Sequence, residues 1–249
     1  MISIKNKQAI MKMRVAGEKL ADIFSRLSSH MVPGVNTLEI DAWILQQLQH
    51  AGLVSRSRGY RGYEYASCIS VNDEVIHGIP QQHKVLQEND LVKVDVCASW
   101  KGYCADMARC FFVGVSDVQK QQLVQTAQRA LDRGIESARA GNRLTDISAA
   151  IQSEVEAHGY GIVRDFAGHG IGKLMHEDPE IPNYGNPGNG PLLRDGMTFA
   201  LEPMITQGNG AVYVADDGWT VRTVDKSLAA HVEDTVVITG NGPEVITRL

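Results

Sequence analysis

The sequence predicts an α+β protein made of two similar halves, and three observations support this class. Amphipathic helical stretches alternate with short β-rich runs along the 249 residues. Residues 91–112 are typical of a β-hairpin, because two apolar runs flank a glycine turn. A helix–helix–strand pattern then begins a second time. We therefore expect a single catalytic domain over residues 1–249, with pseudo-symmetric halves of about 1–112 and 113–249.

The first half begins with two predicted helices. Apolar residues recur at helical spacing over residues 5–29, and the Pro33-Gly34 pair ends that helix. The second helix starts at Asn36, because Glu39 follows three residues later as in a capping box, and it closes at Gly52. A strand over residues 67–72 comes next.

The second half repeats this order. Ser116 with Gln119 marks the start of a long helix that reaches about residue 140, and a shorter helix covers residues 145–158. Two glycines and three apolar or small residues of the first half align with the second half without a gap. The aligned residues are Gly34, Ile40, Ala42, Ile44 and Gly52 with Gly141, Ile147, Ala149, Ile151 and Gly159. The match indicates an internal duplication.

Composition excludes several functional classes. A net charge of −5 and a pI near 5.9 provide no electrostatic signal for nucleic acid. No apolar run approaches the roughly 20 residues of a membrane span, and the first residues lack an export signal. The cysteines show no Cys-x-x-Cys spacing, which favours a reduced cytoplasmic setting. They are Cys68, Cys97, Cys104 and Cys110.

The predicted hairpin carries two acids that face one another. If Ser99 opposes Gly102, then Asp95 lies opposite Asp106 and Cys97 opposite Cys104, all on one face. Like charges in such positions repel, so screening by solvent, a shared proton or a bound cation must compensate. Apolar neighbours on the other face argue against full exposure, and we favour a metal ion that takes further ligands from elsewhere.

The second half offers those ligands. His169 lies within a run of small residues, Glu202 follows an apolar strand and precedes Pro203, and Glu233 lies in a run typical of a buried strand. Each of these residues alone is compatible with a structural role. Together with the hairpin acids they form an oxygen-rich set whose four negative charges suit two divalent ions.

This pattern resembles the type I methionine aminopeptidases of the bacterial kind. The motifs that carry the resemblance are Gly-His169-Gly-Ile-Gly, Ala-Leu-Glu202-Pro and Asp-Gly-Trp219-Thr, combined with the spacing of the five ligands. The similarity runs from the first helix to Ile246. No amino-terminal extension and no large insertion between His169 and Glu202 is present, unlike in the type II enzymes.

The resemblance implies the pita-bread fold around a dinuclear metal site. Asp95 would bind one ion and His169 with Glu202 the other, while Asp106 and Glu233 would bridge both. The ions would be Co, Mn, Fe or Zn. A metal-bound hydroxide would attack the first peptide bond and remove the initiator methionine.

Further residues receive roles from the same resemblance. His176 would hydrogen-bond the scissile carbonyl, His77 would contact the adjacent substrate backbone, and Glu202 would also shuttle the proton. The methionine side chain would occupy a pocket of two tyrosines, a thiol and an indole, which suits a thioether. These residues are Tyr60, Tyr63, Cys68 and Trp219.

Several positions depart from the family pattern. Met175 stands where an aromatic residue is usual, and Ser57-Arg58 replaces a stretch that often carries a cysteine, so the breadth of substrate preference is open. His231 stands where Gln is usual and is either a partner of Glu233 or an ordinary strand histidine. We also hypothesise that oxidation of the Cys97 and Cys104 thiols lowers activity reversibly.

The resemblance implies peptides and nascent chains that start with Met as substrates, in the cytoplasm, and a monomer without membrane contact. It leaves a contact with ribosomes open. A related peptidase that cleaves Xaa-Pro bonds is the first alternative, although those enzymes carry a large amino-terminal domain. A non-catalytic binding module on the same fold is the second, and the complete ligand set argues against it.

Overall fold

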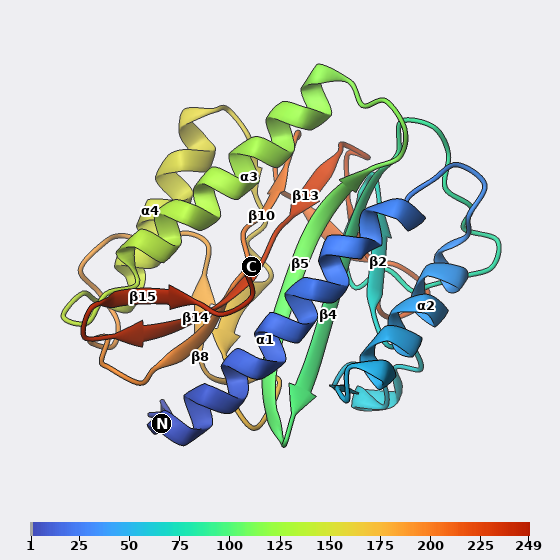
Figure 1. Ribbon diagram of the computed structural model, residues 1–249. Coiled ribbons are helices and arrows are strands. Elements are labelled where there is room, and N and C mark those ends of the chain that lie inside the picture. The colour runs from blue at the N-terminus through green and yellow to red at the C-terminus, as the bar shows by residue number, and fades with distance from the viewer. Residues whose placement is uncertain (1) are drawn as a thin grey trace.

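Two pairs of helices cover the outer faces of a central group of β-sheets (Figure 1). The computed structural model describes residues 2–249. The first pair packs on the hairpin strands, and the second pair packs on the strands of the second half. The helices are α1 (Lys7–Leu27), α2 (Thr37–His50), α3 (Val118–Ser137) and α4 (Leu144–Ala157), with short 3-10 turns η1 (Ser28–His30) and η2 (Tyr60–Gly62). None of the helices in residues 2–249 is long and apolar enough to cross a membrane.

Local capping explains where the helices begin. The Asn36 side chain accepts a hydrogen bond from the Glu39 amide, which confirms Asn36 as the N-cap. The return bond to the Glu39 carboxylate comes from the Asn36 side chain, whereas in a capping box it comes from the backbone amide. The prediction at Ser116 is wrong. Asp117 caps α3 instead, by accepting from the Lys120 amide, and Asp117 is one residue closer to the helix.

Residues 2–249 form four sheets. The hairpin sheet has the order β1-β4-β2, with β5 on β4, and the largest sheet has the order β15-β14-β9-β7-β8. Two smaller sheets have the orders β13-β10-β6 and β11-β12-β3. The last of these joins the halves, because β3 comes from the first half and β11 and β12 from the second. The first-half strands are β1 (Val54–Ser55), β2 (Cys68–Val71), β3 (Glu74–Ile76), β4 (Leu91–Trp100) and β5 (Tyr103–Phe112). The second-half strands are β6 (Gly161–Ile162), β7 (Ala167–Gly170), β8 (Glu177–Pro182), β9 (Thr198–Leu201), β10 (Met204–Thr206), β11 (Val212–Val214), β12 (Val221–Thr223), β13 (Ala229–His231), β14 (Asp234–Thr239) and β15 (Gly242–Val245).

The hairpin exists, but its predicted register is wrong. Trp100 pairs with Tyr103 across a two-residue turn, so Asp95 lies opposite Ala108, and Asp106 lies opposite Cys97. The turn tightens because Lys101 and Gly102 both adopt left-handed φ, of 48° and 78°. The shift is by two residues, which preserves the face of every side chain. The two acids therefore remain on one face, as diagonal neighbours.

The same register change also alters the pairing of two cysteines. Cys104 lies opposite Ser99, so Cys97 and Cys104 are also diagonal neighbours and not a directly opposed pair. Diagonal positions place Cα atoms about 7–8 Å apart, which is beyond the usual span of a disulfide. All four cysteines are free thiols. The Cys97 and Cys104 thiols nevertheless lie within side-chain hydrogen-bonding contact of one another, so the oxidation hypothesis stays a prediction.

The two helix pairs share local geometry. Gly34 and Gly141, which precede the second helix of each pair, have φ of 91° and 96°. Isolated β-bridges join Asn36 to Val85 in the first half and Arg143 to Leu192 in the second. Each residue of the second bridge follows its counterpart in the first bridge by the same number of residues. Helices and sheets thus recur in the arrangement that the pita-bread fold requires.

Candidate metal centre and substrate cavity

The hairpin supplies two acids from the middle of long strands. Asp95 on β4 and Asp106 on β5 are within hydrogen-bonding contact of one another. Thr235 on β14 fixes the Asp106 backbone, because its hydroxyl oxygen accepts from the Asp106 amide and donates to the Asp106 carbonyl, both at 2.8 Å. The strand from the second half thereby anchors an acid of the first half.

His169 comes from β7, at a point where backbones approach closely. A Cβ on Gly168 would lie 2.5 Å from the Ala200 carbonyl oxygen, so only glycine allows β7 to pair with β9 here. The His169 Nδ1 lies 3.0 Å from the Gly170 carbonyl oxygen, which can only accept a hydrogen bond. The Nδ1 atom therefore carries the proton, and the Nε2 lone pair faces Glu202 at 3.5 Å.

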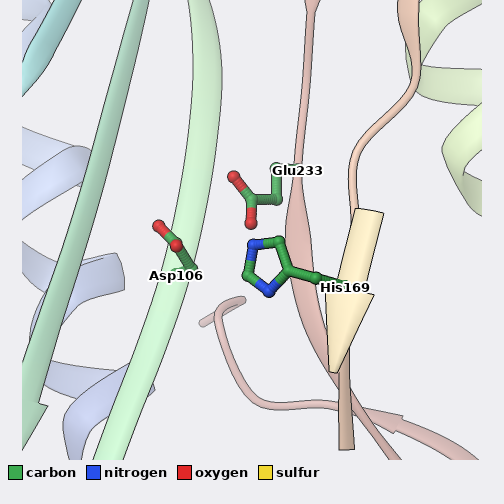
Figure 2. A group of neighbouring side chains, drawn as sticks. All are labelled: Asp106, His169 and Glu233. Carbon is green, nitrogen blue, oxygen red and sulfur yellow. The ribbon is translucent and has the colours of Figure 1, made fainter. Parts of the chain in front are cut away.

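Two glutamates complete the group from strand ends. Glu202 directly follows β9, and Glu233 lies between β13 and β14, where its backbone bridges Ala108 of β5. Figure 2 shows the side chains of Asp106, His169 and Glu233 pointing toward one another from three separate chain segments. One ligand atom from each of these three residues lies within 4.8 Å of the others.

The raised pKa values of the carboxyl groups in this cluster indicate that it lacks a neutralising positive charge. Burial, reinforced by the neighbouring carboxylates, raises the pKa values of Asp95, Glu202 and Glu233 well above their ordinary range. Burial also raises the pKa of Asp106 to about 7. Within residues 2–249, Asp106 Oδ1 and Glu233 Oε1 are buried and accept no hydrogen bond. Divalent cations fit such a set, since hard oxygen ligands with free lone pairs surround the position.

The predicted substrate residues lie around the same space. A cavity of about 440 Å³ is lined by all five acid and imidazole ligands, and also by Tyr60, Tyr63, Cys68, His77, His176 and Trp219. The Tyr63 and Trp219 rings meet edge to face at 5.0 Å, and the Tyr63 hydroxyl donates to the Ser67 carbonyl. A rigid aromatic corner therefore forms one end of the cavity.

Two histidines face the metal cluster. The His176 ring packs edge-on against His169 at 4.3 Å, and its Nδ1 lies 3.2 Å from the Tyr60 hydroxyl oxygen. His77 adopts a left-handed backbone, with φ of 57°, which is uncommon outside glycine and frequent at functional sites. Burial lowers the pKa of His77 to about 4, so its imidazole is neutral near pH 7.

The structure adds residues that sequence reasoning missed. Phe166 lines the cavity and meets the His77 ring edge-on at 5.8 Å; its position three residues before His169 was the available signal. Arg61 also lines the cavity. His231, which was expected beside Glu233, places its Nε2 at 3.7 Å from Glu202. Burial lowers the pKa of His231 to about 3, so it faces Glu202 as a neutral ring.

Comparisons with known proteins agree with this fold and site. The model of metallopeptidase family M24 matches residues 11–240. A methionine aminopeptidase of Clostridium acetobutylicum is 46% identical over 247 residues, which cover 99% of each chain. The structure of a methionine aminopeptidase from Thermotoga maritima superimposes with a TM-score of 0.98 at 42% identity, over 100% of both chains.

The chain belongs to metallopeptidase family M24. Within this family it is a methionine aminopeptidase, since full-length relatives of that activity share 38–46% of its sequence. A prolidase from Pyrococcus furiosus shares the fold with a TM-score of 0.80, but at 23% identity and over 65% of its own length. The Xaa-Pro alternative and the non-catalytic alternative are therefore not favoured.

Proposed function

We propose that this chain removes the amino-terminal methionine of peptides and new polypeptides with two divalent cations held by five residues. Asp95 would bind one ion, His169 and Glu202 the other, and Asp106 and Glu233 both. The observation that carries the proposal is that four carboxylates with raised pKa values line one cavity together with an unprotonated imidazole nitrogen. When bound, the cations supply Lewis acidity that lowers the pKa of water and polarises the scissile carbonyl.

Glu202 is suited to carry the proton between water and the leaving amine. Its carboxylate lies between His169 and His231, at 3.5 and 3.7 Å, and is buried with a raised pKa. A carboxylate within reach of both the attacking water and the leaving amine can accept a proton from the first and pass it to the second. Glu202 would thus be both ligand and general base.

His176 is oriented to donate to the scissile carbonyl oxygen. Its Nδ1 lies 3.2 Å from the Tyr60 hydroxyl oxygen, and in the tautomer whose Nδ1 accepts from this hydroxyl the proton is on Nε2. Burial lowers the pKa of His176, and the nearby Arg61 charge lowers it further, so the ring acts as a neutral donor. His77, neutral and fixed against Phe166, would contact the substrate backbone.

The aromatic corner fits a methionine side chain. Tyr63 and Trp219 present ring edges and faces that favour a thioether, and Tyr60 closes the approach beside His176. Burial and the nearby Asp95 charge raise the pKa of Cys68, so its thiol remains neutral and apolar. Free thiols at all four cysteines support a cytoplasmic location.

Reconstitution with single metals tests the proposal. The chain is stripped of metal, reloaded with Mn, Fe, Co or Zn, and assayed for methionine release from Met-Ala-Ser and for cleavage of an Xaa-Pro peptide. We expect metal-dependent release of methionine and no Xaa-Pro cleavage. Glu202→Gln should abolish turnover, whereas Glu64→Gln, which changes an exposed acid outside the cavity, should not. Absence of methionine release with every metal would refute the proposal.

A further inference from the structure

Arg61 stands where two hollows of the molecule meet. Besides the methionine cavity, a groove of about 620 Å³ opens beside the metal cluster. The two share Arg61, His77, His169, His176 and Glu202, whereas Tyr63 and Trp219 line the cavity alone. Since the methionine side chain occupies the aromatic corner under the proposed function, the rest of the peptide leaves through the groove and passes Arg61.

The position of Arg61 is fixed by its backbone and by stacking. Arg61 has a left-handed φ of 48°, and Gly59 and Gly62 on either side both have φ of 89°. Its guanidinium carbon lies 5.3 Å from the Tyr60 ring centroid, and Tyr60 in turn bonds His176. Left-handed non-glycine residues cost free energy and are typical of sites where position matters.

The Arg61 guanidinium forms no ion pair with any residue that the structure describes. Within residues 2–249, no carboxylate forms an ion pair with Arg61, although the other groove residues include several acids. Glu177 is already paired with Lys5 at 2.7 Å. Asp165 and Glu180 belong to the segment 164–184 of the second half, while Arg61 extends from η2 of the first half. Two arginines and five acids line the groove, and the second arginine, Arg164, stacks on the Tyr184 ring at 4.5 Å within the second-half segment. Arg61 is the groove cation that also lines the methionine cavity.

We infer that Arg61 is a specificity-determining residue that favours substrates with Asp or Glu at the third position. This inference rests on the proposed function and names a preference within it. Tyr60 lies 5.3 Å from both the His176 ring and the Arg61 guanidinium, so these groups are at most about 11 Å apart. An extended peptide advances about 3.3 Å per residue. The third side chain is thus in reach, and the second is expected to be small.

A matched pair of peptides measures the preference directly. We would determine kcat and KM for Met-Ala-Asp-Ser and Met-Ala-Asn-Ser at low salt. The expected ratio of kcat/KM is about three to ten in favour of Asp, arises mainly in KM, and falls as ionic strength rises. Because both peptides are assayed on the same preparation, a partly folded variant does not distort the ratio.

Variants assign the preference to one side chain. Arg61→Gln should bring the ratio close to one, and Arg61→Glu should instead favour Met-Ala-Lys-Ser. Arg58→Gln is the control, since Arg58 lies in the same loop, carries the same charge and lines neither hollow. A wild-type ratio of one, or a ratio that survives Arg61→Gln, would overturn the inference. Failure to cleave either peptide or Met-Ala-Ser would refute the proposed function instead.

Discussion

The two halves of the molecule position their proposed metal ligands in different ways. Asp95 and Asp106 lie in the interior of two ten-residue strands, β4 and β5, whose ladder is regular from end to end. The second-half ligands lie at interruptions. His169 adjoins a register shift between β7 and β8, Glu202 follows the last residue of β9, and Glu233 lies between two strands.

This difference separates two ways to position a charged group. In the hairpin, strand periodicity alone orients the acids, so many different turn and flanking sequences would give the same orientation. In the second half, each ligand depends on a particular close approach or chain end, such as the contact of Gly168 with the Ala200 carbonyl. We therefore expect the second half to tolerate backbone changes less well.

The largest expected effect is the loss of one metal ion and of activity, and the ion that is lost should differ between a first-half and a second-half variant. Asp95→Asn should lose the ion of the first half, and His169→Ala should lose the ion of the second, while each retains about one ion per chain. Activity in both should fall by roughly a thousandfold or more, because a metal and its proton-transfer geometry are lost. Elemental analysis after dialysis gives the stoichiometry. If either variant loses both ions, or the wild type binds one, the division between halves is wrong.

A smaller effect tests the close approach in the second half. Gly168→Ala should lower kcat/KM about 10- to 100-fold and the free energy of unfolding by about 1–3 kcal/mol, because its Cβ would displace β7 and His169. Gly240→Ala is the control, since its Cβ would meet Asp195 at an ordinary 3.5 Å. Urea unfolding and peptide assays measure both. A fully active Gly168→Ala would contradict the view that this contact positions His169.

Prediction from sequence succeeded where periodicity decides the outcome. The helices, the N-cap at Asn36 and the shared face of Asp95 and Asp106 follow from spacing alone. The hairpin register failed, because the choice between a turn at Ser99–Gly102 and one at Lys101–Gly102 depends on the left-handed conformation that Lys101 adopts. The predicted face is nevertheless correct, because a register shift of two residues leaves every side chain on the same face of the sheet.

Contacts between residues that are distant in the sequence were harder to predict. No spacing rule brings His169 next to Glu202 or Thr235 next to Asp106, because these contacts depend on how distant strands pair. The resemblance to a known family supplied the ligand set that periodicity lacked. Arg61 was not predicted as a site residue, since a lone arginine in a loop has no sequence signature. Its proposed role depends on its place between two hollows of the folded chain.

The metal-free protein should show the burial of Asp106 as a pH dependence of stability. Asp106 has a folded pKa of about 7, above the unfolded value of about 3.9. Its contribution to stability is therefore complete below the unfolded pKa and is lost as pH rises through about 7. We expect the metal-free chain to lose about 1 kcal/mol, or several degrees in Tm, between pH 6 and pH 8.

The metal-loaded chain is the control for that titration. Protons compete with cations for the same oxygens, so its Tm should fall as pH is lowered through this range. In the metal-free form, Asp106→Asn should flatten the slope and raise Tm at pH 8. A metal-free Tm that rises from pH 6 to pH 8 would contradict the buried-charge account.

The smallest expected effect concerns the hairpin turn. Gly102→Ala forces a methyl group into a left-handed residue but meets no atom within 4 Å, so its cost is confined to the backbone, at about 1 kcal/mol. Activity should stay within about twofold, because the ladder from Leu91 to Phe112 and its buried face maintain the register without help from the turn. Urea unfolding measures the first quantity and methionine release the second. If activity instead falls as far as in Gly168→Ala, the turn, and not strand periodicity, positions the acids, and the contrast between the halves disappears.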